Sequence, residues 1–229
     1  MNKFLLFLLL FLYLPLFCHA QILEKDFQFW SETNIYFPIL KKKNRNGEKV
    51  EKINFFVSGT FRVGKNLTKP DDERIGGGFD FILNKLVTLT TSYLYRAGQP
   101  VTGGKEFEHR IRIEATFGHK WQKFSLKDRN RFEYRFRTPQ SDSVRFRNKF
   151  TFAVPVKKSG KEIFAPFAAT EVFYDFHENK INRNELSLGI SKKFDKVTTI
   201  DFFYLWQRNR GNVLKNVNVV GVNLKFKID

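Results

Sequence analysis

Polar and apolar residues alternate along several stretches of the chain, most clearly over residues 106–117. This stretch reads EFEHRIRIEATF, in which Phe107 and Ile111 belong to a mostly apolar set at every second position. The alternate positions, from Glu106 to Thr116, are all charged or polar. A period of two residues is typical of a β-strand with one apolar and one ionic face. The pattern returns over residues 131–137 and 145–154.

This alternation predicts an all-β chain of eleven strands. We find no apolar run with the i, i+3, i+4, i+7 spacing of an amphipathic helix. The 28 Phe residues also favour strands, because aromatic side chains fit a pleated surface well. The predicted strands cover about residues 27–37, 52–63, 75–83, 86–96, 106–117, 121–137, 144–155, 164–176, 183–194, 198–208 and the residues after 216.

The lengths of these strands favour a membrane barrel. Several reach 11 or more residues, whereas strands of globular sheets usually have about five or six. Crossing a bilayer takes roughly 9–11 residues of a tilted strand. Short turns also alternate with longer loops from residue 84 onward, as in transmembrane barrels. Residues 156–163 are the exception, because they form a long connection where a short one is expected.

Alternation alone does not say which face points inward, so two architectures compete. A soluble β-sandwich or lipocalin-like barrel turns its apolar face inward, whereas an outer-membrane barrel turns it toward lipid. The aromatic apolar faces and the mixed charges of the polar faces favour the membrane. Gly221, Leu224 and Phe226 also fit the glycine-x-x-apolar-x-apolar signal by which the barrel-assembly machinery recognises its substrates. We therefore predict an up-and-down antiparallel transmembrane β-barrel.

The strand count conflicts with a regularity of such barrels. Bacterial single-chain barrels have even numbers of strands. Eleven strands therefore imply that one segment is missed, split or absent from the wall, and we expect ten to twelve strands in all.

The first residues have the features of a secretory signal peptide. Lys3 precedes an apolar run of roughly 14 residues, which is too short for a membrane-spanning helix, and Ala20 offers a small residue before a cut. We predict a signal peptide over residues 1–20 and a barrel domain over residues 21–229. The mature chain then has no cysteine, so packing or a closed sheet must supply its stability. The predicted location is the outer membrane of a Gram-negative bacterium.

Short motifs recur in order along the mature chain. They are Phe29-Trp30, Tyr95-Arg96, His109-Arg110, Arg135-Phe136-Arg137, Arg145-Phe146-Arg147, Glu171-Val172-Phe173 and Asn184-Glu185-Leu186. With these motifs the chain resembles the outer-membrane β-barrel family called domain of unknown function 2490 (DUF2490). The resemblance covers nearly all of the mature chain and implies a fold and a location. The family has no settled activity, so the resemblance implies no catalytic residues.

Candidate chemistry is sparse. The mature chain has three histidines, His109, His119 and His177, and they lack metal-ligand spacing. We expect no enzyme activity, no cofactor and no metal. A barrel enzyme acting on outer-membrane lipid is an alternative, and His177 is its candidate base. A soluble exported barrel that binds an apolar ligand is another.

Charge is the remaining signal. The net charge is +17, and it falls to +16 when Lys3 leaves with the signal peptide. Export argues against a nucleic-acid partner, so we expect outer-membrane lipid, lipopolysaccharide and the barrel-assembly machinery as partners, with the oligomeric state open. We predict a structural role or a narrow passage for small solutes, biased toward anions. The charges expected to face the lumen are Glu108, Arg110, Arg112, Glu114, Arg131, Glu133, Arg135, Arg137, Arg145, Arg147, Glu171 and Glu185.

Overall fold

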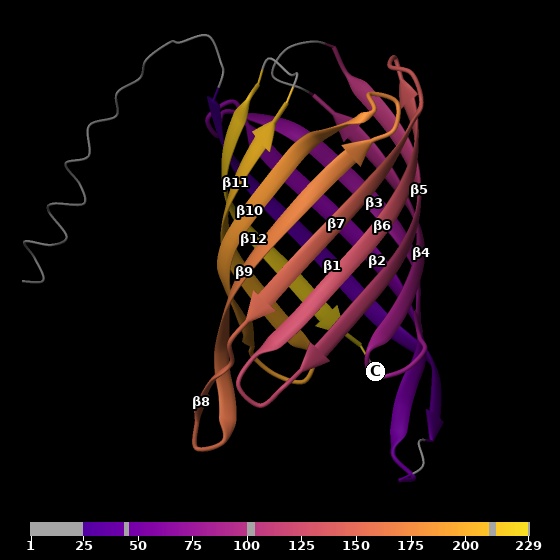
Figure 1. Ribbon diagram of the computed structural model, residues 1–229, viewed down its shortest axis with the longest axis vertical. Helices are drawn as coiled ribbons and strands as arrows, with labels where there is room; N and C mark the ends of the chain where they lie inside the picture. The colour runs from indigo at the N-terminus through magenta and orange to yellow at the C-terminus, as the bar shows by residue number, and fades with distance from the viewer. Residues whose placement is uncertain (1–24, 44–45, 100–103, 211–213, 229) are drawn as a thin grey trace, which may run out of the picture.

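Eleven long strands form the wall of a closed barrel (Figure 1). The computed structural model describes residues 25–43, 46–99, 104–210 and 214–228. The twelfth strand, β8, pairs only with β9 and extends below the wall. The strands are β1 Lys25–Lys43, β2 Lys49–Gly64, β3 Lys69–Ile82, β4 Val87–Gly98, β5 Glu106–Lys120, β6 Ser125–Thr138, β7 Ser143–Ala153, β8 Val156–Lys158, β9 Lys161–Asp175, β10 Lys180–Lys193, β11 Thr198–Asn209 and β12 Asn216–Lys227.

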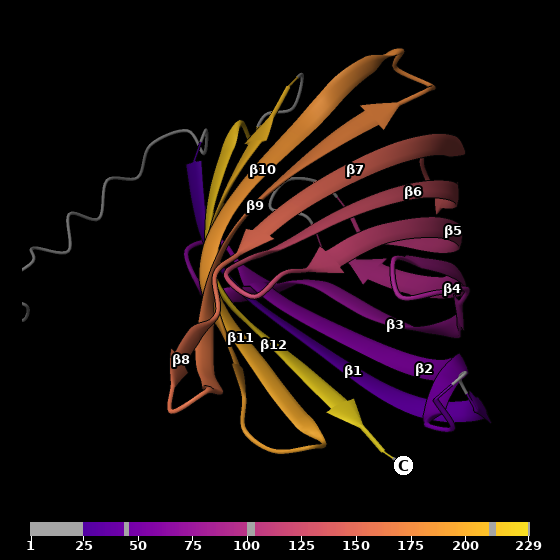
Figure 2. The same ribbon diagram turned by 60° about the horizontal axis from the view of Figure 1, so that its bottom comes forward.

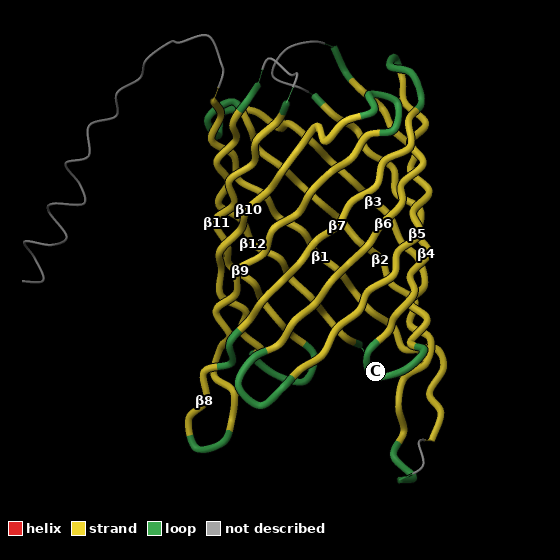
Figure 3. Tube along the Cα trace, in the orientation of Figure 1, coloured by secondary structure: helices red, strands yellow, loops and turns green. Residues whose placement is uncertain are grey.

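All regular structure in the described residues is strand, and the wall strands cross the barrel obliquely (Figure 3). No helix in this part of the chain is long and apolar enough to cross a membrane. The predicted signal peptide, residues 1–20, lies outside the described residues.

The two faces of each wall strand differ in chemistry, as the alternation predicts. Ile113 on the outer face of β5 is 64% exposed, whereas Glu133 on the inner face of β6 is fully buried. Phe107, Ile111 and Phe117 share the exposed face of β5. The apolar residues therefore cover the outside of the barrel and the ionic residues fill the inside. This arrangement contradicts the soluble alternative, in which the apolar faces of the strands would point inward.

The barrel closes in a way that the parity argument did not allow. Every pair of neighbouring wall strands is antiparallel except β1 and β12, which run parallel from Lys25↔Asn216 to Tyr36↔Lys227. Figure 2 shows these two strands side by side. A parallel seam permits an odd number of strands. The count of eleven wall strands is thus confirmed and lies within the predicted ten to twelve. The even-number rule, from which we inferred a segment that is missed, split or absent from the wall, does not apply to the wall of this barrel.

Two connections also differ from the prediction. The strand expected over residues 121–137 begins at Ser125, because Trp121 and Phe124 form a tight turn. The backbone N–H of Trp121 donates to the carbonyl of Phe124 over 2.8 Å, and the two rings lie 4.7 Å apart. The long connection over residues 156–163 contains β8, which pairs with the start of β9 as a hairpin below the wall (Figure 1).

Glycine permits two close approaches in the wall. In β3, a Cβ on Gly76 would lie 2.6 Å from the carbonyl oxygen of Tyr93 in β4, and the register shows no bulge there. In β12, a Cβ on Gly221 would overlap the ring of Phe203, its partner in β11. The ring of Phe203 therefore lies against the inner wall because the opposite residue has no side chain.

Arginine and lysine occupy different parts of the barrel. Most arginines line the lumen, whereas most lysines lie near the end at which β12 terminates. This end is at the bottom of Figure 1, and we call it the lower end. We call the set of lysines near this end the lysine collar. It comprises Lys41, Lys42, Lys43, Lys49, Lys52, Lys85, Lys120, Lys123, Lys157, Lys158, Lys161, Lys192, Lys193, Lys196 and Lys227.

Ile113→Arg distinguishes a lipid-facing surface from a water-facing one. At an exposed site in water this change is close to neutral. In a bilayer it should lower the free energy of unfolding by about 2–4 kcal/mol, because a cation near the midplane loses its hydration. Urea unfolding in phospholipid vesicles measures the difference, with Ile113→Leu as the matched control. An unchanged stability for the Arg variant would contradict a lipid-facing position.

Candidate functional site: the charged lumen

The lumen is lined mainly by charged and hydroxyl side chains that come from every wall strand. Eleven of the twelve charges expected to face the lumen line one of two cavities. The twelfth, Glu133, is fully buried behind its arginine partners. The inward positions follow from strand pairing, because directly opposed residues share a face: Arg112 opposes Glu133, and Glu114 opposes Arg131.

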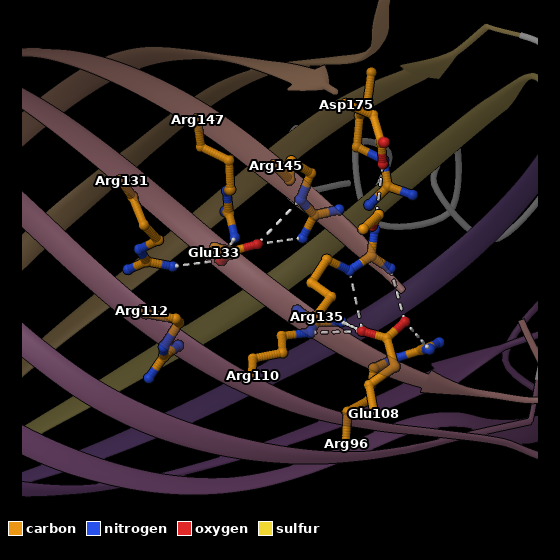
Figure 4. A network of polar contacts seen from close by, with 12 residues as sticks. Arg96, Glu108, Arg110, Arg112, Arg131, Glu133, Arg135, Arg145, Arg147 and Asp175 are labelled. Atoms are coloured by element: carbon orange, nitrogen blue, oxygen red, sulfur yellow. Dashed lines mark hydrogen bonds and ion pairs between the residues drawn. The ribbon is translucent and has the colours of Figure 1, made fainter. Parts of the chain in front are cut away.

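Glu133 is the centre of the first ion-pair network (Figure 4). Its carboxylate accepts from Arg145 over 2.6 Å, from Arg147 over 3.0 Å and from Arg131 over 3.5 Å. Arg147 also reaches Glu171 over 2.6 Å. Three guanidinium groups thus compensate one carboxylate that has no access to water. Such a buried charge is tolerated only when it is paired and hydrogen-bonded.

The same network continues toward the lower end. Glu171 also accepts from Arg129 over 2.8 Å, and Arg131 donates to Glu114 over 2.7 Å. Arg129 lies on β6, which is separated from β9 by β7, so its pair with Glu171 spans a whole strand. The Arg129–Glu171 pair therefore ties together two strands that share no backbone hydrogen bonds, whereas Arg131–Glu114 reinforces the neighbouring strands β5 and β6.

Glu108 is the centre of a second network nearer the upper end (Figure 4). It pairs with Arg110 over 2.6 Å, with Arg135 over 2.7 Å and with Arg96 over 3.2 Å. Arg96 also binds Asp72 of β3 over 2.5 Å. This network therefore links β3, β4, β5 and β6 across the inner surface.

Sequence reasoning missed several members of these networks. Arg96 appeared only within a family motif, and Arg129 continues the series of inward residues that was recognised from Arg131 onward. Asp72 falls between the second and third predicted strands but lies inside β3. Arg62 was also missed, although it lies at an inward position of the alternating strand β2. Arg62, Arg96 and Arg129 lie within predicted strands, so following the alternation to the ends of those strands would have found them. Asp72 required the third predicted strand to begin before residue 75, as β3 does.

The lumen contains two cavities, one toward each end. The lower cavity has a volume of about 610 Å³ and the upper about 550 Å³. The lower cavity is lined by ten Arg or Lys and six Asp or Glu residues. The upper cavity is lined by nine Arg and seven Asp or Glu residues. We call the residues that line both cavities the waist. They are Trp30, Arg62, Arg74, Arg110, Arg147 and Glu185.

Not every cation in the lumen has an anionic partner. Arg112 donates from Nε to the hydroxyl of Ser92 over 3.0 Å, and no described carboxylate lies within ion-pair distance of it. Lys127 also lines the lower cavity without an ion pair to any described residue. Two carboxylates of the same lining, Glu32 and Asp80, also have no ion pair to a described residue and accept hydrogen bonds from uncharged side chains. The excess of positive charge in the lower cavity is therefore a matter of number, with ten cations to six anions in its lining.

The histidines lie apart from one another. His109 is on the outer face of β5, where its ring forms a 2.5 Å hydrogen bond with the hydroxyl of Tyr93. His119 packs against Trp121, with ring centroids 4.3 Å apart. His177 follows β9 in the polar turn at the upper end, where its backbone N–H donates to Asp175 over 3.0 Å. In the described parts of the chain, no group of three or more His, Cys, Asp or Glu residues could hold a metal ion.

Comparisons with known proteins agree with this fold. The family described as "Protein of unknown function (DUF2490)" matches residues 27–218. No curated protein matches the chain. Among solved structures, the NanC porin is similar with a TM-score of 0.52 and 10% identity, over 89% of this chain and 99% of that one. The β domain of the Bordetella autotransporter BrkA is similar with a TM-score of 0.48 and 13% identity, over 72% and 78% of the two chains.

Glu133→Gln tests the dependence of the wall on ion pairing. In a site without water, Arg145 would lose its only described carboxylate partner, and two further arginines would each lose one of two. We therefore expect the free energy of unfolding to fall by about 3–5 kcal/mol. Glu162→Gln is the matched control, because it breaks an exposed 2.7 Å pair with Lys120 outside the lumen and should cost at most about 1 kcal/mol. Urea unfolding in vesicles compares the two. Equal losses would refute a special role for the buried carboxylate.

Proposed function

The chain belongs to the DUF2490 family of proteins of unknown function, and we propose that it is an outer-membrane channel for the narrow, anion-biased passage of small solutes. The observation that carries this proposal is the lumen, which contains two cavities that meet at the waist and are both lined by more cations than anions. In a pore of this kind, uncompensated cations lower the energy of an anion relative to a cation.

An apolar outer face supports the location. Phe132, Ile113 and Phe202 are more than half exposed on the outside of the wall, which would be costly in water but is favourable in lipid. The apolar start of the chain supports export. Lipid and lipopolysaccharide would then surround the barrel. Leu224 and Phe226 in β12 remain our candidates for recognition by the barrel-assembly machinery.

The waist supports a narrow passage over a wide diffusive pore. Arg110 and Arg147 extend from the β5 and β7 walls and are held in place by Glu108 and Glu171. Trp30 and Arg62 extend from β1 and β2 on the other side. The interior of an eleven-strand barrel is modest in width, between that of filled eight-strand barrels and that of open porins of about 16 strands. Passage would therefore suit small solutes that exchange their water for arginine contacts.

We infer a non-catalytic role from the positions of the histidines. His109 faces outward beside Tyr93, and His119 packs on Trp121 at the lower end. Neither contacts a serine or carboxylate among the described residues, as a nucleophile–base pair requires. Lipid turnover by the purified barrel that is lost in His177→Ala would favour the enzyme alternative instead.

Arg112→Gln tests the anion bias. Arg112 has no carboxylate partner, so its removal subtracts a lumen charge without breaking an ion pair. In a planar bilayer under a KCl gradient, we expect the reversal potential to move from an anion-selective value toward zero. Lys196→Gln is the matched control, because it removes one charge from an exposed turn of the lysine collar. At about 1 M salt the Debye length is about 3 Å, so that rim charge is screened.

The outcome separates the candidate roles. A cation-selective wild type, or a selectivity that Arg112→Gln leaves unchanged, would contradict the anion bias. No conductance in clean reconstitutions of the folded barrel would refute the passage of solutes.

A further inference from the structure

Arg62 at the waist is a guanidinium with unused hydrogen-bond donors. It lines both cavities, its buried Nε has no hydrogen-bond acceptor, and its two terminal amino groups donate to no described residue. No described carboxylate forms an ion pair with it. Asp72, which opposes it across the β2–β3 pair, is already bound to Arg74 and Arg96. Since buried donors are rarely left without acceptors, this group is suited to an acceptor that comes from outside the protein.

Trp30 holds the Arg62 guanidinium in position. The Cζ of Arg62 lies 3.4 Å from the centroid of the Trp30 ring, so the two groups stack. The indole N–H of Trp30 donates to the Gln28 side chain over 2.7 Å, and Gln28 donates to Asp26 over 2.7 Å.

Asp26 anchors this relay to the wall. Its carboxylate accepts from the backbone N–H groups of Lys65 and Asn66 over 3.2 and 2.8 Å, just beyond the end of β2. All three side chains of the relay, Asp26, Gln28 and Trp30, are buried. A stacked guanidinium on such a fixed support presents its planar edge with little loss of side-chain entropy on binding.

An apolar wall lies beside this guanidinium. Trp30, Leu205, Val217 and Val219 form a buried cluster on the inner face of β1, β11 and β12, and Phe203 packs against it. Leu205 and Phe203 line the lower cavity, and Val217 lines the upper. In the strand order of the barrel, this wall lies opposite β5 and β6, which carry the arginine networks. The lumen is therefore apolar on one side and cationic on the other.

We propose that the waist binds amphipathic organic carboxylates. The planar carboxylate would accept two hydrogen bonds from the two terminal amino groups of Arg62, whose planar geometry it matches, because the Nε is not accessible from the lumen. The apolar part of the solute would lie in the lower cavity along Leu205 and Phe203. That cavity, at about 610 Å³, is within the range of small-molecule sites. This inference rests on the proposed passage of anions and names the class of solute.

The apolar wall separates this class from inorganic anions. Phosphate or chloride would gain nothing from Leu205 or Phe203 and would forfeit part of its hydration beside them. An uncharged aromatic compound would leave the donors of Arg62 without an acceptor. Only a ligand with both an anionic edge and an apolar body uses both walls.

Calorimetric titration of the folded full-length barrel in detergent tests the site, with 2-naphthoate as the probe. Acetate has the same head group without the apolar body, and 2-naphthalenemethanol has the body without the charge. We expect 2-naphthoate to bind best. Arg62→Gln should weaken its binding about tenfold or more, since a charge-assisted bidentate contact is lost. Heat-modifiable gel migration checks that each variant is folded.

Arg112→Gln is the matched variant, because it removes another unpaired lumen cation that lies outside the waist. It should keep 2-naphthoate binding within about twofold of wild type, since the fork of Arg62 is untouched. Equal weakening in both variants would mean that general lumen charge, and not Arg62, attracts the probe, and would overturn the proposal. Equal binding of acetate and 2-naphthoate would overturn the role of the apolar wall.

Conductance separates this inference from the proposed function. An anion-selective channel that does not bind 2-naphthoate would overturn the carboxylate site and leave the passage of anions intact. Binding that depends on Arg62 in a barrel without conductance would support the site and refute the passage.

Discussion

The whole barrel depends on the pairing of charges inside its wall. Glu133 has no contact with water, and three arginines from β6 and β7 surround its carboxylate. A charge in such a place is tolerable only with partners at hydrogen-bond distance. The same requirement makes neighbouring networks share residues, since Arg131 and Arg147 each serve two carboxylates. The inner face therefore behaves as a connected lattice that holds the strands in register.

This constraint explains why a few exceptions are informative. Where nearly every lumen arginine has a carboxylate, one without a partner stands out. Arg112 is bonded only to a serine hydroxyl, and Arg62 only stacks on Trp30. Removing a paired arginine would disturb the wall, whereas removing one of these two changes mainly the lumen. Structural and functional charges can therefore be told apart by their partners, although both are arginines on inward positions.

Much of the fold could be predicted from the sequence, because alternation reports directly on which face each residue occupies. The eleven wall strands and their apolar outer faces follow from it. Alternation says nothing about which strands become neighbours, so the parallel seam between β1 and β12 could not be foreseen. Contacts that span a strand, such as Arg129 with Glu171, were hidden for the same reason. The predicted set of lumen charges lacked Arg62. Its role depends on stacking against Trp30, which lies 32 positions earlier in the chain.

The lysine collar makes the two mouths of the lumen electrically unequal. Its charges surround only the lower end, where the few acidic residues include Glu51 and Glu162, each already paired with a lysine. A ring of like charge concentrates mobile counter-ions around it and speeds their capture. At low ionic strength, anions would therefore enter the lower mouth faster than the upper one, so that the current rectifies. Salt would abolish this asymmetry, because the collar is exposed, while the buried waist would keep its preference.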